Sequence, residues 1–74
     1  MIKHQCRLIE IRGDQEEYGD LLGQEAPVCV SHSEAWFGIG GDLLIMPKKR
    51  VVITDDTIAV STNLGNTFVF KKLN

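Results

Sequence analysis

The sequence lacks a long hydrophobic run. No apolar stretch approaches the roughly 18 residues that a membrane-spanning helix needs. The first ten residues, MIKHQCRLIE, also lack the apolar core of a signal peptide. These absences predict a cytoplasmic protein with no membrane partner. Cysteines in that compartment are normally kept as thiols, so a disulfide is not expected.

Cysteine and histidine are scarce, with two of each in the chain. Each cysteine nevertheless has a histidine within three positions, because His4 is near Cys6 and Cys29 is near His32. Together they offer the nitrogen and sulfur donors of a structural zinc site, but neither pair has the ligand spacing of common zinc fingers. Both cysteines have apolar neighbours, where a free cysteine behaves as a small hydrophobe. The pattern favours two core thiols with no metal or cofactor, and it leaves the zinc set as an alternative.

No stretch carries a convincing catalytic motif. SHSE at 31–34 has serine, histidine and glutamate, but members of a catalytic triad normally meet across the fold rather than along one short segment. FGIGGD at 37–42 is rich in glycine, yet it precedes the strand-like LLIMP and not a helix whose N-terminal amides would hold a phosphate. A domain this small also has little room for a pocket of the usual roughly 300–1,000 Å³. The sequence predicts that the protein is not an enzyme.

The first segment of the chain, IKHQCRLIEIR, is rich in strand-forming residues. If it is extended, His4, Cys6 and Leu8 share one face. After Leu8 the parity changes, because Ile9 and Ile11 are now the apolar residues. This pattern predicts either a strand that is covered on both faces or a β-bulge between Leu8 and Ile9.

The next stretch, GDQEEYGDLLGQEAP, is punctuated by glycines. Asp14 could cap a short helix, with the glutamate three residues on completing a capping box. Tyr18, Leu21 and Leu22 would then share one helical face. The glycine after Tyr18 argues against a long helix, because glycine costs about 1 kcal/mol relative to alanine there. The segment near 14–22 is predicted to be a short helix or an ordered loop.

The remaining sequence consists of short apolar runs separated by turn residues. PVCVSH is rich in strand formers, and two hairpins are predicted, one around Gly40–Gly41 and one around Asp55–Asp56. NLGNTFVFKKL begins with a turn and ends in a strand with Phe68 and Phe70 on one face. The predicted fold is mainly β: a single small domain, residues 1–74, with an antiparallel sheet or barrel of five to six short strands. The alternative is an α+β domain whose short helix packs on an open sheet.

Charge is unevenly distributed. The net charge is −2, but residues 10–42 contain eight acids, with Arg12 as their only arginine or lysine. Within this region, the segment 14–25 combines five acids with three apolar residues. A cluster of acids without bases attracts a basic partner, and apolar side chains that become buried in the interface supply affinity. The predicted partner-binding residues are Asp14, Glu16, Glu17, Tyr18, Asp20, Leu21 and Leu22.

Size and charge together indicate a class of function. Short acidic single-domain chains are used by bacteria and phages to block or redirect a larger host machine. The leading hypothesis is therefore a small non-enzymatic regulator or inhibitor, bacterial or phage, that binds a larger protein with a basic surface. The transcription apparatus and a nuclease are examples of such a target.

A basic cluster supports an alternative hypothesis. Lys48, Lys49 and Arg50 are consecutive, and Trp36 could stack on a base. Small β-barrels bind RNA or single-stranded DNA through such basic and aromatic groups. The phenylalanines would either add stacking faces or fill the core. The overall acidity argues against this alternative.

Overall fold

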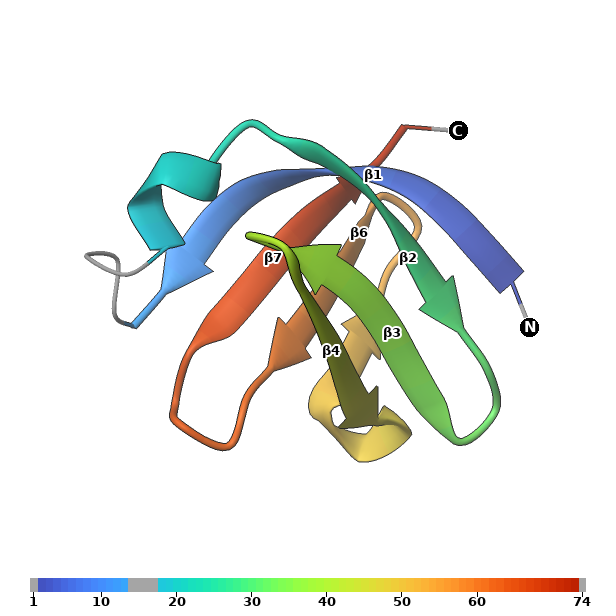
Figure 1. The fold of residues 1–74 in the computed structure, drawn as a ribbon. Helices are drawn as coiled ribbons and strands as arrows, with labels where there is room; N and C mark the ends of the chain where they lie inside the picture. The colour runs from blue at the N-terminus through green and yellow to red at the C-terminus, as the bar shows by residue number, and fades with distance from the viewer. Residues whose placement is uncertain (1, 14–17, 74) are drawn as a thin grey trace.

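The computed structural model describes residues 2–13 and 18–73, and Figure 1 shows strands that wrap into a nearly closed barrel. The mainly β class is confirmed, although the described residues form seven strands rather than five or six, because even a three-residue run pairs with its neighbour. Two 3-10 helices, η1 (Gly19–Leu21) and η2 (Lys48–Arg50), complete the structure. The strands are β1 (Ile2–Arg12), β2 (Glu25–Val30), β3 (Glu34–Ile39), β4 (Asp42–Pro47), β5 (Val51–Ile53), β6 (Thr57–Ser61) and β7 (Thr67–Lys72).

The sheet is a single antiparallel layer in the order β4-β3-β2-β1-β7-β6-β5. Strands β1 to β4 form one meander and β5 to β7 form another, and the pairing of β1 with β7 joins the two. β4 and β5 are therefore the two edges of the sheet. They are consecutive in the chain through η2, so the barrel is open along the line between them.

β1 is long enough to serve both meanders. Residues 2–7 pair with β2, and residues 6–12 pair with β7. The register with β7 shifts between Leu8 and Glu10, which confirms the bulge predicted from the change of apolar parity. The bulge returns Ile11 to the buried side of the strand. β7 ends at Lys72, which pairs with Cys6, so the first residues of β1 extend beyond the second meander.

The core fills the inside of the barrel with side chains from both meanders. Phe37 of β3 lies between Phe68 and Phe70 of β7, with ring centroids 5.7 Å and 5.1 Å away and the rings edge to face. The sequence prediction that Phe68 and Phe70 share a face is confirmed, since both are fully buried. Burial of each such side chain contributes about 1.5–3 kcal/mol to folding. The other buried apolar residues of this cluster are Cys6, Leu8, Ile11, Val28, Val30, Ala35, Val51, Ile58 and Val60.

Both predicted hairpins are present. Gly40 and Gly41 form a two-residue connection between Ile39 and Asp42, the last pair of β3 and β4. Their φ angles of 59° and 86° suit the left-handed turn that two-residue hairpins prefer. The β5–β6 turn around Asp55–Asp56 is closed by a hydrogen bond from the Thr54 amide to the Thr57 carbonyl, 2.9 Å long.

The segment predicted as a short helix contributes only η1 to the described structure. Residues 14–17, including the expected cap Asp14, lie outside the described residues. The Tyr18 ring contacts Phe68 edge-on at a centroid distance of 5.1 Å, and Leu21 also packs against the core. The α+β alternative is wrong, because both described helices have only three residues and the sheet itself curls around the core. Neither of these helices is long or apolar enough to cross a membrane.

Candidate functional site

The edge strand β4 presents an unprotected apolar stretch. Leu44 and Met46 turn inward and pack against the core, whereas Leu43 and Ile45 are 67% and 51% exposed on the outer face. Natural edge strands normally carry charges, prolines or bulges that prevent further pairing. In β4 the only such residues are Asp42 and Pro47 at its two ends. Four consecutive apolar residues therefore line a backbone edge with which no other described strand pairs.

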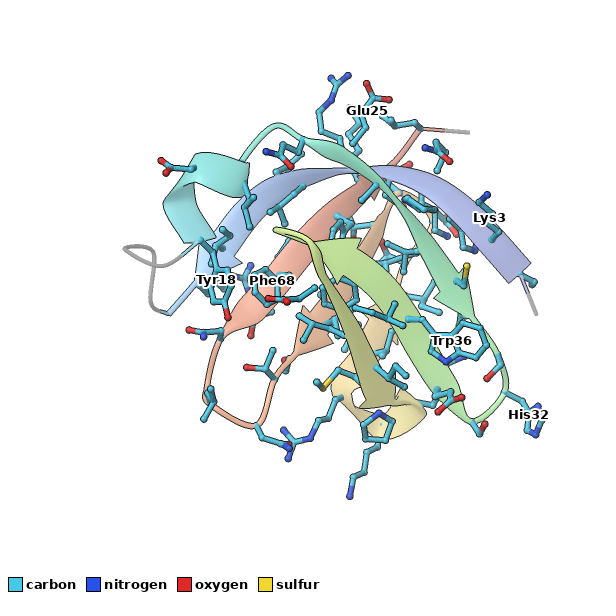
Figure 2. All side chains as sticks on the ribbon, viewed as in Figure 1. Lys3, Tyr18, Glu25, His32, Trp36 and Phe68 are labelled. Carbon is cyan, nitrogen blue, oxygen red and sulfur yellow. The ribbon has the colours of Figure 1, made fainter. Side chains whose placement is uncertain are left out.

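The outer face beside β4 continues this apolar surface. Cys29 of β2, Trp36 of β3 and Ile45 of β4 are direct cross-strand partners, so they form one row on the outside of the sheet. Figure 2 shows Trp36 at the opposite side of the molecule from Tyr18. The indole Nε1 of Trp36 is buried and has no hydrogen-bond acceptor among the described residues. We call Cys29, Trp36, Leu43 and Ile45, together with the free backbone edge of β4, the β4 surface.

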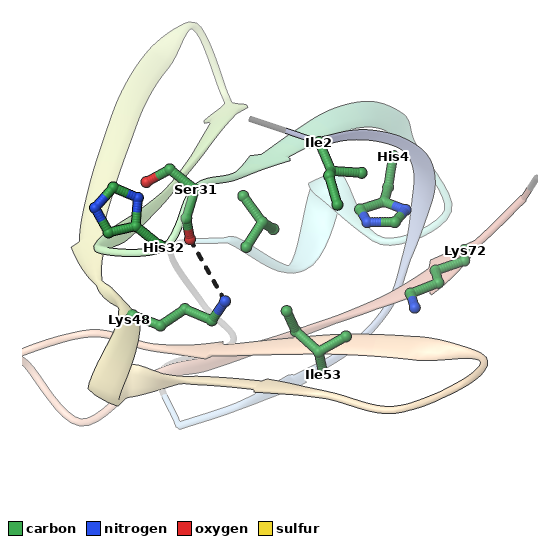
Figure 3. Close-up of a pocket in the computed structure, with 8 residues that line it drawn as sticks. Ile2, His4, Ser31, His32, Lys48, Ile53 and Lys72 are labelled. Carbon is green, nitrogen blue, oxygen red and sulfur yellow. Dashed lines mark hydrogen bonds between the residues drawn. The ribbon is translucent and has the colours of Figure 1, made fainter.

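A second feature is a pocket of about 570 Å³ at the end of the barrel where β1 begins (Figure 3). The small size of the chain predicted little room for such a pocket, but the first residues of β1 extend past the end of β7 and leave this space beside them. Ile2 pairs with Val30 on β2, and Figure 3 places Ile53 across the gap from Ile2. The lining residues are Ile2, His4, Val30, Ser31, His32, Lys48, Ile53 and Lys72.

Two lysines enter the pocket from opposite sides, as Figure 3 shows. The Lys48 ammonium donates to the carbonyl of Ser31 at 3.4 Å. The Lys72 ammonium donates to the carbonyl of Thr54 at 2.8 Å. Both ammonium groups thus lie beside backbone carbonyls of the β2–β3 and β5–β6 connections.

The four residues of the zinc hypothesis do not converge. Cys6 lies in the core on the inner face of β1, whereas Cys29 alternates with the buried Val28 and Val30 and therefore faces outward. Both cysteines are free. His4 and His32 both line the pocket, but Figure 3 shows them on opposite sides of it, and the two sulfur atoms lie on opposite faces of the sheet. The described residues contain no cluster of three metal-ligating side chains.

The different positions of the two thiols predict different reactivity. Burial raises the pKa of Cys6, and the Lys72 ammonium only partly opposes this shift. The Cys6 thiol therefore keeps its proton in the folded state, and it stabilises the fold fully below about pH 9, the ordinary value. This contribution is lost as pH rises through the raised pKa. We expect a thiol reagent at pH 8 to modify Cys29 first and Cys6 on the order of a hundredfold more slowly, because Cys6 must wait for local opening.

Mass spectrometry after timed alkylation measures the two rates. Cys29→Ser should remove the fast phase, and Cys6→Ala should leave it unchanged. Equal rates at both positions in the folded wild-type protein would contradict the placement of the two thiols.

The acidic docking residues are only partly available. Tyr18 and Leu21 pack against the core, while Asp20 is exposed and Leu22 is 43% exposed. Asp14, Glu16 and Glu17 lie outside the described residues. Two of the three expected apolar anchors thus have a structural role, and truncating them would lower stability as well as any binding.

Most of the aromatic side chains that the nucleic-acid hypothesis needs for base stacking are not available at the surface. The three phenylalanines fill the core, and Trp36 lies half-buried on the outer face. Lys48, Lys49 and Arg50 form η2, but only Lys48 lines the pocket. The SHSE string forms the β2–β3 turn and the first residue of β3, and the Ser31 hydroxyl accepts a hydrogen bond from the Glu34 amide at 3.1 Å.

These features define a small antiparallel β-barrel-like domain with one apolar edge and one cationic pocket. Comparison of the chain with protein-family models, with curated proteins and with solved structures found no match. The functional argument therefore rests on the geometry of this fold. Sequence reasoning missed both features. The run of four apolar residues in β4 was a visible signal for the edge, whereas no local signal brings His4, Lys48 and Lys72 together.

Proposed function

We propose that the protein is a small non-enzymatic regulator that acts by binding a larger protein, and that the partner adds an extended segment to the free edge of β4. The observation that carries this proposal is the stretch Leu43–Met46, apolar throughout and unpaired on one side. An added strand would satisfy the free backbone groups of β4 and give affinity through main-chain hydrogen bonds. Without a partner, such an edge is an aggregation hazard.

The side chains of the β4 surface supply specificity. Leu43 and Ile45 are spaced two residues apart, so they fit alternate side chains of a paired segment. Trp36 lies next to Ile45, and tryptophan is among the residues that most often dominate binding energy at interfaces. Its unsatisfied indole N–H gives a partner acceptor a position to fill after a small rotation of the ring.

The charges at the ends of this stretch favour a basic partner. Asp42 and Glu34 flank the β4 surface, because Asp42 begins β4 and Glu34 pairs with Pro47 at its end. A segment with apolar residues between lysines or arginines would match both features. This agrees with the basic partner predicted from the acids of the segment 14–25, although the surface proposed here is β4 rather than that segment.

The test replaces one apolar side chain of the β4 surface with a charged one. Partners are captured from bacterial lysate on the wild-type protein, identified, purified and titrated against variants. Ile45→Lys should weaken binding of the purified partner by about 30-fold, or about 2 kcal/mol, because a buried anchor becomes an unpaired charge. The matched control is Leu64→Lys in the β6–β7 turn, where the leucine is 86% exposed and far from β4 in the sheet order. It should bind as wild type does.

Two outcomes would overturn the proposal. One is equal affinity of Ile45→Lys and wild type for the purified partner. The other is a homodimer in size-exclusion chromatography that Ile45→Lys converts to a monomer, with no other partner retained. In that case the occupant of the β4 edge is a second copy of the chain.

A further inference from the structure

We propose that the pocket between β1, η2 and β7 binds a phosphate monoester carried on a nucleoside-sized body. The charge of its lining is the first reason. Lys48, Lys72 and two histidines line it, and no acid is among its described lining residues. The chain as a whole is acidic, with ten acids against eight lysines and arginines. A cationic pocket in such a protein is a local reversal of charge, which favours an anion there.

The lysines have donors to spare. An ammonium group has three N–H donors, and each lysine uses one of them for a backbone carbonyl, Lys48 for that of Ser31 and Lys72 for that of Thr54. These carbonyl bonds hold the ammoniums in place without neutralising their charge. The two side chains enter from opposite sides (Figure 3), so the proposal places one dianionic phosphate between their remaining donors. Hydrogen bonds between such charged groups are about twice as strong as neutral ones.

Three apolar side chains form another part of the wall. Ile2 and Ile53 are 63% and 39% exposed, and Val30 completes this part of the lining. A ligand with a ring or aliphatic body would cover these side chains, whereas inorganic phosphate alone would leave them in water. The volume of about 570 Å³ lies within the range of small-molecule sites. Charge and apolar wall together point to an organic phosphate.

The acids nearest in sequence to the lining residues are Glu34, Asp55 and Asp56, and none of them lines the pocket. Asp55 and Asp56 occupy the exposed β5–β6 turn. The Asp56 contact with this region is through its backbone, since its carbonyl accepts from the Lys72 amide at 2.8 Å. The same phosphate chemistry could come from a free mononucleotide or from the 5′ end of a single-stranded nucleic acid, and the experiment separates these sources.

The chain offers two matched pairs of lysines for the test. Lys48 lines the pocket and its neighbour Lys49 does not; Lys72 lines it and its neighbour Lys71 does not. Each of the four is replaced by glutamine, so every variant loses the same charge. Binding of adenosine 5′-monophosphate, adenosine, inorganic phosphate and a 5′-phosphorylated hexathymidylate is followed by methyl NMR. The methyl signals of Ile2 and Ile53 report the pocket, and those of Ile9 and Ile45 serve as internal controls.

The expected result is saturable binding of the mononucleotide that shifts the Ile2 and Ile53 signals, with adenosine and phosphate each binding at least about tenfold more weakly. Lys48→Gln and Lys72→Gln should each lower the affinity for the mononucleotide by about tenfold or more. Lys49→Gln and Lys71→Gln should leave this affinity unchanged. If the oligonucleotide binds more tightly and depends on the same two lysines, the natural source of the phosphate is a nucleic-acid end.

Three outcomes would overturn the proposal. The first is no shift of the Ile2 and Ile53 signals by any phosphate ligand. The second is an equal effect of all four lysine variants, which would indicate non-specific attraction. The third is oligonucleotide binding that Lys49→Gln weakens as much as Lys48→Gln does, which would assign the affinity to the η2 surface. None of these measurements involves the β4 partner, so failure here and failure of the proposed function are separate results.

Discussion

Replacing Phe68 by alanine is expected to lower the free energy of unfolding by about 3–5 kcal/mol. Phe68 is fully buried, and its ring contacts Tyr18 and Phe37 edge to face. The substitution removes a large apolar side chain and leaves a cavity between β3, β7 and the residue before η1. Native proteins are stable by roughly 0.05–0.15 kcal/mol per residue. For a domain of this size, the loss is a large part of the whole stability.

Urea denaturation followed by circular dichroism measures this loss. Leu64→Ala is the control, since Leu64 is 86% exposed and its truncation should change stability by less than about 0.5 kcal/mol. A loss below about 1 kcal/mol for Phe68→Ala would mean that the ring is not the centre of the core. Because Tyr18 contacts this ring, the same variant should also loosen the start of η1.

Gly13→Ala is expected to have the second largest effect and to lower the free energy of unfolding by about 2–4 kcal/mol. Gly13 follows β1 with a φ angle of 113°, which an L side chain rarely adopts. An added Cβ would also collide with the Asn66 side chain and lie 3.1 Å from the Gly65 carbonyl oxygen. Asn66 is buried in the β6–β7 turn, so it cannot move away without disturbing that turn. The backbone strain and the steric overlap with Asn66 therefore both contribute to the loss of stability.

Gly23→Ala separates these two causes. Gly23 also has a positive φ, 88°, but an added Cβ there meets nothing within 4 Å. Gly23→Ala should lower the free energy of unfolding by only about 1–2 kcal/mol, from backbone strain alone. Both variants are compared with wild type in the same denaturation experiment. Equal losses at the two positions would show that the contact between Gly13 and the β6–β7 turn does not constrain the fold.

The features that sequence could predict are local. The change of apolar parity after Leu8 located the bulge, because one inserted residue is enough to reverse which side chains face the core. The pair Gly40–Gly41 located a hairpin, because only a tight turn needs two consecutive residues of positive φ. In both cases the physical cause lies within a few residues of its effect.

The features that sequence could not predict depend on distant pairings. The zinc hypothesis put Cys6 and Cys29 together, but their strands place them on opposite faces, since Cys6 pairs with Ala26 and Cys29 with Lys3. Tyr18 was expected at a docking surface, yet the β-barrel leaves room for it against Phe68. The pocket depends on where β1 leaves β7, which no single segment encodes.

The central position of β1 also has a kinetic consequence. Both meanders pair strands that are neighbours in the sequence, and apart from the longer connection of residues 13–24 between β1 and β2 they close through short loops. The pairing of β1 with β7 instead joins opposite ends of the chain, as in the contact of Cys6 with Lys72. Closing so long a loop costs conformational entropy before the favourable contacts between β1 and β7 form, and this slows folding. Until β1 and β7 meet, Phe37 on one meander and Phe68 on the other remain in water, so the hydrophobic core and the complete sheet are formed in the same late step.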